Sequence, residues 1–210
     1  LAHRAYAGFA FDGDGDRVIA VNSEGIVKNG DDILAILLTN PTWSNQQGVV
    51  STVMANQGLE VSVTSQGKKF VRTNVGDKYV LEALIQNNLS LGAEPSGHVI
   101  IRDIIPTGDG ILVALKTLET MIKTGNGTMK SAPKFPQIVI NVPIKRRLEL
   151  TESPLADMIE QSKQQLPQGR VLVRYSGTEQ LIRVMVEDED QTHMNAVAQE
   201  LAQKIKQELT

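Results

Sequence analysis

Phe11-Asp12-Gly13-Asp14-Gly15-Asp16-Arg17 is the stretch around which the rest of the chain is best interpreted. Three aspartates alternate with two glycines, and an arginine follows them. Because glycine accepts positive φ angles, the backbone can curl until the three aspartates converge on one point. Converging carboxylate oxygens are hard ligands that suit Mg²⁺, and Mg²⁺ commonly shares its coordination shell with a phosphate. The stretch therefore predicts a site for a cation and a phosphate.

An EF-hand calcium loop is excluded by the residues that follow the aspartates. Such a loop needs a glycine after the third acidic position and a glutamate at its end, whereas Arg17 and Ser23 hold these positions. The flanking residues 7–11 and 18–21 have the apolar pattern of strands rather than helices. An acidic turn in a β-hairpin stays open as a plainer interpretation, although crowded aspartates repel one another unless a positive charge lies among them.

The composition is that of an ordinary globular chain, with 41% hydrophobic and 21% charged residues among 210. A net charge of -3 gives no indication of a nucleic-acid or anionic-membrane surface. There is no cysteine, which excludes disulfides, thiolate zinc sites and cysteine nucleophiles. No apolar run approaches the length of a membrane span and no signal peptide is visible. We therefore expect a cytoplasmic location.

The chain begins Leu1-Ala2-His3, without a methionine, and the first strand pattern comes only a few residues later. That strand has no upstream neighbour in the sequence with which to form a sheet. We therefore expect the chain to be part of a longer protein.

Strand and helix patterns alternate after the first hairpin. Such alternation predicts an α/β fold with a mixed, mostly parallel sheet and helices on both faces. Ligands in these folds collect at the carboxyl ends of the strands. Asp31 and Asp32 are expected to cap the first helix. The strand patterns cover residues 48–53, 70–73 and 99–101, and the helical patterns cover residues 31–38, 56–66, 79–85 and 110–122.

A linker is indicated between Thr124 and Pro136, where glycines, asparagine and two prolines gather. Beyond it, the sequence predicts a small α+β domain. The patterns that indicate it are strands at residues 137–143, 170–175 and 181–186, a helix capped at Ser153 and a long terminal helix. The predicted regions are residues 1–25, the end of a truncated metal-binding domain; residues 26–127, a sugar-binding α/β domain; and residues 128–210, a C-terminal phosphate-binding domain.

A second chemical stretch, Gly92-Ala93-Glu94-Pro95-Ser96-Gly97-His98, lies between a helix and a strand. Glu94, Ser96 and His98 offer a carboxylate, a hydroxyl and an imidazole within five residues, a set suited to gripping sugar hydroxyls. A histidine near a phosphate can also assist proton transfer. A polar turn with a helix-breaking proline stays open as the alternative.

A third stretch, Arg174-Tyr175-Ser176-Gly177-Thr178-Glu179, connects two strand patterns tightly. These residues can surround and bind a phosphate. The arginine offers a planar guanidinium, the serine and threonine offer hydroxyl groups, and the glycine lets backbone N–H groups point inward. The stretch lacks the lysine and the spacing of a P-loop, so nucleotide binding is not implied. A plain hairpin turn stays open here too.

In this order and at these separations, the three stretches resemble the metal, sugar-binding and phosphate-binding loops of the α-D-phosphohexomutases. Val75-Gly76-Asp77-Lys78-Tyr79-Val80 and Thr107-Gly108-Asp109-Gly110-Ile111 resemble more specifically the branch that interconverts glucosamine 6-phosphate and glucosamine 1-phosphate. The resemblance runs from end to end of the chain. It implies a four-domain enzyme, of which this chain would hold the end of the second domain, the third and the fourth.

The resemblance also implies a mechanism in which an active-site phosphoserine phosphorylates the sugar, and the bisphosphate reorients and returns its other phosphate. Asp12, Asp14 and Asp16 would hold Mg²⁺, and Arg17 would steady the phosphoserine. The remaining implied assignments are Glu94 and Ser96 for sugar hydroxyls, His98 for a place close to the reacting end, and Arg174, Ser176, Gly177 and Thr178 for the non-transferring phosphate.

The chain departs from the family pattern at Ala93, Pro95, Tyr175 and Gln180, positions that shape the backbone more than the contacts. No equivalent of the serine loop is found, so the chain alone is expected to be inactive and to need the missing N-terminal domains of the same protein.

The expected small-molecule partner is a phosphorylated hexosamine, with no nucleic acid and no membrane, and a homodimer stays open. A phosphomannomutase or phosphoglucomutase, and a non-catalytic sugar-phosphate-binding module, are the rival functions.

Overall fold

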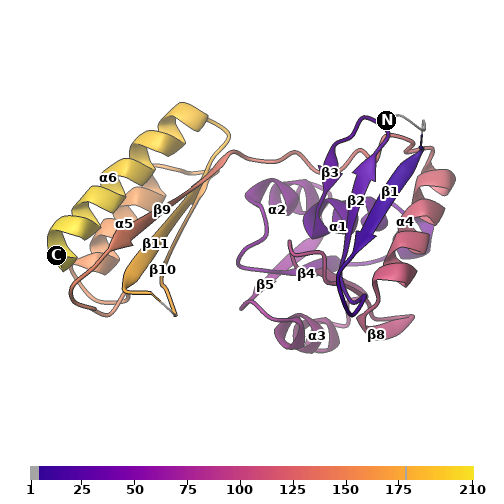
Figure 1. Cartoon of the computed structure of the whole chain (residues 1–210), viewed down its shortest axis with the longest axis horizontal. Helices are drawn as coiled ribbons and strands as arrows, with labels where there is room; N and C mark the ends of the chain where they lie inside the picture. The colour runs from indigo at the N-terminus through magenta and orange to yellow at the C-terminus, as the bar shows by residue number, and fades with distance from the viewer. Residues whose placement is uncertain (1–4, 178) are drawn as a thin grey trace. The chain divides into compact units, whose positions relative to one another are not determined.

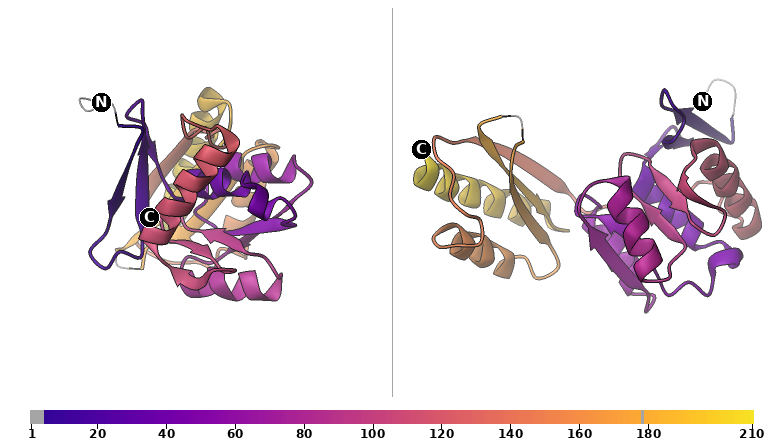
Figure 2. Two further views of the ribbon diagram at one scale, coloured as in Figure 1. Left: turned by 90° about the vertical axis from the view of Figure 1, so that its right-hand side faces the viewer. Right: turned by 90° about the horizontal axis from the view of Figure 1, so that it is seen from below.

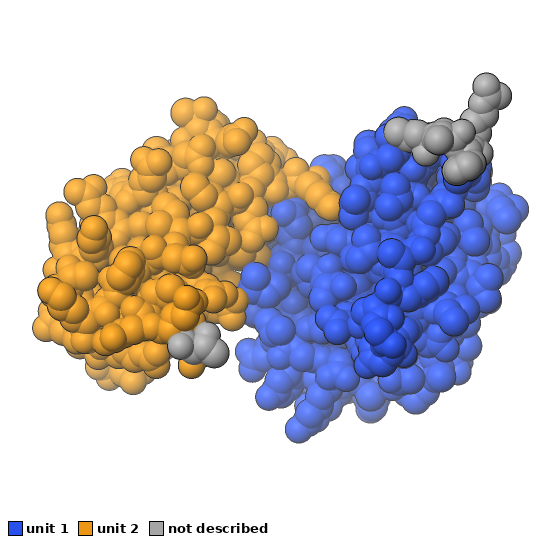
Figure 3. Space-filling view, in the orientation of Figure 1, with its two compact units in different colours: residues 1–133 blue, residues 134–210 orange. Residues whose placement is uncertain are grey.

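The computed structural model describes residues 5–177 and 179–210. Two compact units make up the chain, Leu1–Pro133 and Lys134–Thr210 (Figures 1 and 3). The boundary between them lies inside the segment whose composition indicates a linker. The three predicted regions, residues 1–25, 26–127 and 128–210, stay a prediction. A division into compact units does not show what each region binds.

Unit 1 begins with an antiparallel hairpin around the aspartate-rich stretch. Strands β1 (Ala7–Phe11), β2 (Val18–Asn22) and β3 (Val27–Lys28) form a sheet in that order. Phe11 lies opposite Val18 in the register, so residues 12–17 make the turn that joins β1 to β2. The strand patterns on both sides of the aspartates are therefore confirmed.

The main sheet of unit 1 is mixed, but it is not mostly parallel as predicted. Strand β4 pairs in parallel with β5 and β6, whereas β6–β7 and β7–β8 are antiparallel. The reason is the tight turn of residues 94–98, which returns the chain directly and leaves no room for a helical crossover. In sheet order the strands are β5 (Lys69–Thr73), β4 (Gly48–Thr52), β6 (Leu91–Ala93), β7 (Val99–Ile101) and β8 (Ile105–Gly108).

Two apolar cores cover this sheet. Helices α1, α2 and α4 contribute to a core that includes Val49 and Leu91, while α3 packs against Val50 and Ile100. Neighbouring strand residues point to opposite faces, so Val49 and Val50 belong to different cores and helices lie on both sides. The helices are α1 (Gly30–Leu38), α2 (Gln57–Thr64), α3 (Asp77–Gln86) and α4 (Gly110–Thr124), with a short 3₁₀ helix at Pro41–Trp43.

Helix α1 is capped by Asn29, not by the predicted Asp31. The Asn29 side chain accepts a hydrogen bond from the Asp32 backbone at 3.2 Å, and the Asp32 carboxylate accepts one from the Asn29 backbone at 2.9 Å. This reciprocal pair is a capping box. Asp32 is therefore the third residue of the helix (N3) and not its N-cap.

Unit 2 is a three-stranded antiparallel sheet whose order is β10-β11-β9, covered by two helices. Its fold matches the predicted small α+β domain. Helix α5 begins at Leu155 after Pro154, so the predicted Ser153 cap is wrong; the Ser153 hydroxyl contacts Asp157 instead. The elements are β9 (Gln137–Pro143), α5 (Leu155–Gln164), β10 (Arg170–Tyr175), β11 (Leu181–Glu187) and α6 (Gln191–Leu209).

Among the helices of residues 5–177 and 179–210, none combines the length and the apolar character that a membrane span requires.

Among the described residues, the apolar core of unit 2 is built from residues of that unit. Leu201 is fully buried in it. We expect Leu201→Ala to lower the unfolding free energy of unit 2 by about 2–5 kcal/mol, because the truncation leaves a cavity. Hydrogen exchange read peptide by peptide should detect faster exchange in unit 2 and unchanged exchange in unit 1. Gln203→Ala, at an exposed position of the same helix, is the control; equal acceleration in unit 1 would contradict separate cores.

Candidate active site

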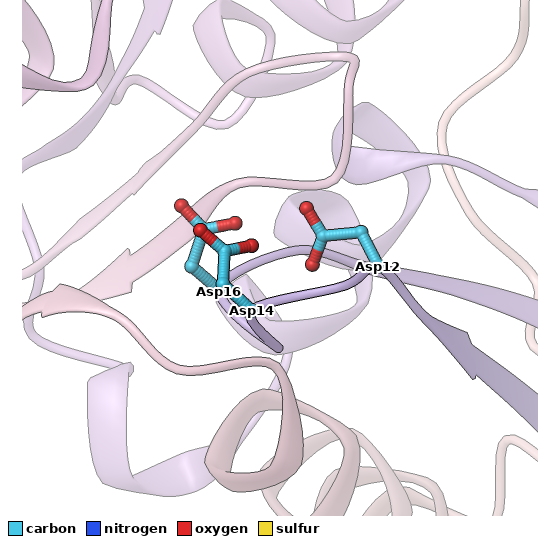
Figure 4. Close-up of side chains that lie close together, drawn as sticks. All are labelled: Asp12, Asp14 and Asp16. Atoms are coloured by element: carbon cyan, nitrogen blue, oxygen red, sulfur yellow. The ribbon is translucent and has the colours of Figure 1, made fainter.

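The aspartate-rich turn brings its three carboxylates together. Asp12, Asp14 and Asp16 each offer one oxygen, and these oxygens all lie within 4.8 Å of one another. Figure 4 shows the carboxylates of Asp14 and Asp16 side by side, with that of Asp12 facing them. Gly15 adopts a φ of 75°, the left-handed conformation that lets the turn curl. The predicted convergence of the aspartates is therefore what the structure contains.

Arg17 supplies the positive charge beside this cluster. Its Nε lies 2.6 Å from Asp12 Oδ2 and 3.4 Å from Asp16 Oδ1, and its backbone N–H donates to Asp12 Oδ1 at 3.1 Å. Desolvation acts to raise the pKa of Asp12, but the hydrogen bonds from Arg17 outweigh it and lower that pKa below its ordinary value. The Asp12 carboxylate in turn raises the pKa of Arg17.

A single guanidinium does not balance three carboxylates. When all three are ionised, the cluster with Arg17 has a net charge of two minus, and like charges this close repel. A divalent cation would remove that repulsion. The donor set consists of carboxylate oxygens, which suits Mg²⁺ better than a softer transition metal. The residues present therefore fit the predicted metal.

The second stretch, residues 94–98, is the turn between β6 and β7, and it is attached to the start of β2. The backbone N–H of Val18 donates to the Gly97 carbonyl at 3.0 Å, and Arg17 and His98 form a β-bridge. Gly97 has a φ of +97°, and a Cβ there would lie 2.4 Å from the Val18 carbonyl oxygen. Only glycine tolerates both the conformation and the close approach.

This attachment brings His98 to the metal loop. Its Nδ1 lies 3.1 Å from Asp16 Oδ2, and the side chain is 7% exposed. An ionised carboxylate can only accept hydrogen bonds, so an ionised Asp16 requires the donor tautomer at Nδ1 of His98. The other ring nitrogen, Nε2, is buried and has no hydrogen-bond partner among the described residues.

Glu94 and Ser96 lie on the same turn in different surroundings. Glu94 accepts a hydrogen bond through Oε1 from the backbone of Gly76 at 2.9 Å, which fixes its carboxylate against the loop before α3. Ser96 is exposed and lines a small cavity of 190 Å³ together with Asp12 and Arg17. The structure thus brings Ser96 beside the metal loop, and its predicted role in binding sugar hydroxyls stays a prediction.

Two glycines, Gly108 at the end of β8 and Gly110 at the start of α4, support this arrangement, a role that sequence reasoning missed. A Cβ at Gly108 would lie 2.5 Å from His98 Cε1 and 2.6 Å from His98 Nε2. The Gly110 backbone donates to the Gly15 carbonyl at 2.8 Å. The side chain of Asp109, between them, caps α4. The alternation of glycines around an aspartate was the available signal; it indicates the start of a helix and carries part of the family resemblance, but it does not by itself show the contact with His98.

The third stretch joins β10 to β11 in unit 2. The Ser176 backbone donates to the Leu181 carbonyl at 2.9 Å, and its hydroxyl oxygen accepts from the Glu179 backbone at 3.2 Å. Arg174 and Gly177 are exposed. The predicted residue Thr178 lies outside the described residues. The stretch is thus a strand-to-strand turn with a guanidinium at its start.

Arg183 and Arg147 lie beside this stretch and were missed from the sequence. Arg183 lies directly opposite Arg174 in the β10–β11 register, so both guanidinium groups leave one face of the sheet. The buried Nε of Arg183 has no hydrogen-bond partner among the described residues. Arg147 donates to the Ser176 carbonyl at 3.1 Å and stacks on Tyr175. Glu179 lies 3.5 Å from the Nη2 of Arg183, so a carboxylate already offsets part of the charge of these two opposed guanidinium groups.

The chain matches two family models in succession. Residues 29–137 match the phosphoglucomutase/phosphomannomutase alpha/beta/alpha domain III, and residues 139–204 match the C-terminal domain of the same family. The two matches meet near the boundary between the two units.

Curated relatives are similar over nearly the whole chain. The phosphoglucosamine mutase of Nitrosococcus oceani is 44% identical over 212 residues, which cover 98% of this chain and 47% of that protein. The phosphoglucosamine mutase of Caldanaerobacter subterraneus is 42% identical, covering 100% of this chain and 49% of that protein. The chain therefore spans about half the length of the curated relatives it matches.

Solved structures share the fold at lower identity. The Aspergillus fumigatus N-acetylphosphoglucosamine mutase, crystallised with GlcNAc-6P and magnesium, aligns with a TM-score of 0.73 at 17% identity, over 96% of this chain and 49% of that one. A phosphoglucomutase/phosphomannomutase family protein from Burkholderia thailandensis aligns with a TM-score of 0.71 at 19% identity, over 96% of this chain and 47% of that one. The chain belongs to the phosphoglucomutase/phosphomannomutase family, and its relatives of about 43% identity are phosphoglucosamine mutases.

Proposed function

We propose that this chain is the sugar- and phosphate-binding half of an enzyme that interconverts glucosamine 6-phosphate and glucosamine 1-phosphate. The full-length enzyme transfers a phosphoryl group from a phosphoserine to the sugar and takes back the other phosphate from the bisphosphate intermediate. The relatives named above support the choice of the amino sugar, since they are phosphoglucosamine mutases. The chain spans about half of each, and we assign the phosphoserine to the remaining part.

The observation that carries the proposal is the direct contact between the metal loop and the sugar loop. His98 hydrogen-bonds Asp16 at 3.1 Å, and Val18 hydrogen-bonds Gly97 at 3.0 Å. Ser96, Asp12 and Arg17 line one cavity. A sugar hydroxyl held by the turn of residues 94–98 would therefore lie close to the carboxylate cluster, which is the proximity that phosphoryl transfer requires.

Asp12, Asp14 and Asp16 would hold Mg²⁺ through one carboxylate oxygen each. When bound, that ion supplies positive charge that neutralises the phosphoryl group during transfer. Arg17 keeps Asp12 ionised and oriented through its short hydrogen bond of 2.6 Å. With a metal in place, the guanidinium of Arg17 can also attract the oxygens of the phosphoserine.

His98 acts in this proposal as a positioning residue and not as the acid or base. Its Nδ1–H donates to Asp16, and its Nε2 is buried against Gly108. Neither nitrogen is therefore available to exchange a proton with the substrate in this arrangement. Its contribution is to hold the Asp16 carboxylate toward the other two aspartates, as residues behind metal ligands commonly do.

Glu94 and Ser96 are the proposed sugar contacts. Because Gly76 occupies Oε1 of Glu94, the second carboxylate oxygen is the one left to accept hydrogen bonds from sugar hydroxyls. The Ser96 hydroxyl is exposed and can both donate and accept. Such a pair can bind the two orientations of the sugar that the bisphosphate must adopt.

Arg174, Ser176, Gly177 and Thr178 are the proposed clamp for the non-transferring phosphate, and we add Arg183 to them. The opposed guanidinium groups of Arg174 and Arg183 can bind two oxygens of a phosphate, which would compete with Glu179 for Arg183. Ser176 offers its hydroxyl proton, since its oxygen already accepts from Glu179.

We expect Asp14→Asn to reduce turnover of glucosamine 6-phosphate at least about a hundredfold in the full-length enzyme that contains this chain. Asp14 is exposed and its loss removes one charged ligand without opening a core, so the fold should persist. Steady-state kinetics with glucosamine, glucose and mannose 6-phosphates measure the effect. Glu82→Gln, an exposed carboxylate on α3, is the control.

Unchanged turnover in Asp14→Asn would contradict the metal assignment. Turnover of glucose or mannose 6-phosphate alone would favour the phosphoglucomutase or phosphomannomutase alternative. Binding of sugar phosphates without any turnover by the full-length protein would favour a non-catalytic sugar-phosphate-binding module.

Gly108→Ala tests the positioning of His98. The added methyl would lie 2.5 Å from the His98 ring, which must move away from Asp16. We expect Mg²⁺ affinity to fall by about tenfold, and the Nδ1–H signal of His98 to shift in proton–nitrogen NMR spectra. Gly8→Ala is the matched control, because its methyl would meet Val21 at an ordinary 3.9 Å. An unshifted His98 signal would mean that the position of the His98 ring does not depend on Gly108.

Arg183→Ala tests the additional phosphate contact. We expect the affinity of the full-length enzyme for glucosamine 6-phosphate to fall by about tenfold to a hundredfold, the usual effect of losing a hydrogen bond to a charged group. Arg183→Lys should recover only part of the loss, because lysine keeps the charge but not the planar fork. Lys163→Ala, an exposed cation on α5, should behave as wild type. If Arg183→Ala and Lys163→Ala bind glucosamine 6-phosphate with equal affinity, Arg183 does not contact the phosphate.

A further inference from the structure

Unit 2 has a sheet edge that the proposed chemistry does not use. In the order β10-β11-β9, both β10 and β9 are edges of the described sheet. Strand β10 carries Arg170 and Arg174, and charged residues protect an edge from pairing with further strands. Strand β9 carries no charged residue, and its one proline, Pro143, is its last residue. The backbone of β9 is therefore suited to pair with another strand.

A groove lies along this edge. It has a volume of 580 Å³, and it is lined by residues 140–143 of β9 and by residues of the segment 202–210, which contains the last turns of α6. Among the described residues that line it, Lys206 has the only charged side chain. The long apolar stem of a lysine lets its ammonium group stay in solvent at the rim of an interface. The groove therefore presents strand backbone and uncharged side chains to a partner.

Helix α6 carries an amide side chain at every fourth position. Residues four apart form one of the inclined ridges with which helices pack against each other. An amide both donates and accepts hydrogen bonds, so a ridge of amides can bond to an identical ridge. The last two of these residues also line the groove beside β9. We call the set the amide ridge; it consists of the half-buried Asn195 and the exposed Gln191, Gln199, Gln203 and Gln207.

Helix α6 runs beside β9 over the whole length of the strand. At one end Glu187 lies opposite Gln137, and α6 begins shortly after Glu187. At the other end the backbone N–H of Lys145 donates to the Leu209 carbonyl at 2.9 Å. The strand and the helix therefore start and finish together, as Figure 1 shows for β9 and α6.

Both carboxylates of α6 are paired away from this ridge. Glu200 pairs with Lys204 at 2.6 Å, and Glu208 pairs with Arg146 at 2.8 Å. A second amide ridge would therefore meet no like charge, whereas a nucleic acid or an acidic peptide needs a cluster of cations that the ridge does not contain. The surface fits an identical copy better than it fits a charged partner.

Both helices of unit 2 lie on one face of its sheet. Ile140, Val184 and Val173 are neighbours across the three strands, and all three belong to the core that the helices cover. Figure 2 shows α5 and α6 together on one side of the strands. Helix α6 packs over β9 and β11, whereas α5 packs over β10. A second sheet added at β9 would thus bring its own α6 next to this one.

We propose that β9 and the amide ridge form a docking surface for a second copy of this chain. The two copies are related by a two-fold axis perpendicular to the sheet, the symmetry of most dimers. Strand β9 pairs antiparallel with its counterpart, and the two three-stranded sheets become one. The two α6 helices then lie antiparallel on the same face, and the two amide ridges meet. This association does not depend on which sugar the enzyme converts.

The length of β9 sets the register of the pairing. Full overlap of its seven residues places Ile140 on the two-fold axis. Val139 of one copy is then opposite Asn141 of the other, on the face of the sheet away from the helices. The side chain of Ile140 meets its counterpart on the helix-covered face. The pairing thus leaves no charged side chain opposite another, which would destabilise it.

Sedimentation equilibrium of the 210-residue chain tests the association. We expect a species of twice the monomer mass of 22.9 kDa that dissociates on dilution. Val139 is 47% exposed, so Val139→Lys adds a charge to the edge without opening the core. We expect this variant to weaken association at least about tenfold. Val27→Lys, the same change at a 58% exposed position of edge strand β3, is the control and should associate as wild type.

Introduced cysteines test the register, because the chain contains no cysteine of its own. A mixture of Val139→Cys and Asn141→Cys chains should form a disulfide-linked dimer under mild oxidation. Residues directly opposite each other bring their Cβ atoms within the reach of a disulfide. A mixture of Val27→Cys and Asn141→Cys chains is the control. Equal yields of linked dimer in the two mixtures would contradict the pairing of β9 with β9.

Gln207→Glu tests the amide ridge. The change keeps the shape of the side chain but removes its hydrogen-bond donor and adds a negative charge. We expect association to weaken by about threefold to tenfold, the usual effect of one lost hydrogen bond. Gln161→Glu, the same change at an exposed position of α5, should leave association unchanged. If the two variants associate equally, the amide ridge does not contact the second copy.

Three further results would overturn the inference. A monomer at every concentration would exclude a second copy as the occupant of the surface. A monomer whose β9 amides exchange slowly with solvent would mean that another segment of the same chain covers the edge. A dimer that forms equally well with Val139→Lys would be joined through another surface, such as the edge strand β1. Turnover is not part of any readout, so a failed proposal about the substrate would not affect the result.

Discussion

Repulsion among three aspartates is the constraint on which unit 1 depends. Their nearest oxygens lie within 4.8 Å of one another, and a hairpin turn alone would relax by spreading them. Arg17 offsets one charge, and a network of backbone hydrogen bonds holds the rest of the turn in place. The Gly110 backbone bonds Gly15 inside the turn, and the Val18 backbone, just after it, bonds Gly97. In the proposed function, relief of this repulsion would favour the binding of a cation.

Glycines make this network possible because they let backbones approach where a Cβ would not fit. A Cβ at Gly30 would lie 1.9 Å from the Glu94 carbonyl oxygen, so the start of α1 lies directly behind the sugar loop. Gly97 and Gly108 allow the same loop to contact β2 and β8. The core of the sheet supports these contacts through Ser51, which bonds the Ala93 carbonyl at 2.6 Å. The side chains of residues 94–98 thus extend from a closely packed backbone framework, as precise positioning of a ligand would require.

Unit 2 also collects side chains of like charge, but these are positive instead of negative. Arg174 and Arg183 are brought face to face by the β10–β11 register, and Arg147 is fixed nearby by its stack on Tyr175. Tyr175 is itself held by Leu148, to whose carbonyl its hydroxyl donates at 2.6 Å. In each unit, like charges are collected at a strand-to-strand turn, and a side chain of opposite charge offsets part of them: Arg17 in unit 1 and Glu179 in unit 2. The proposed ligands, a divalent cation for unit 1 and a phosphate for unit 2, would offset the rest.

The amino-acid sequence by itself determined most elements of the fold and the residues of the three loops. Helix and strand patterns are local, and Asp12, Glu94 and Arg174 stand in short motifs whose chemistry is visible without neighbours. Only the tertiary structure decided the direction of β7, the pairing of His98 with Asp16, the support from Gly108 and the opposition of Arg183 to Arg174. Each of these joins segments far apart in the chain or depends on strand register. Pairing between distant segments follows from packing in three dimensions, which no local pattern encodes.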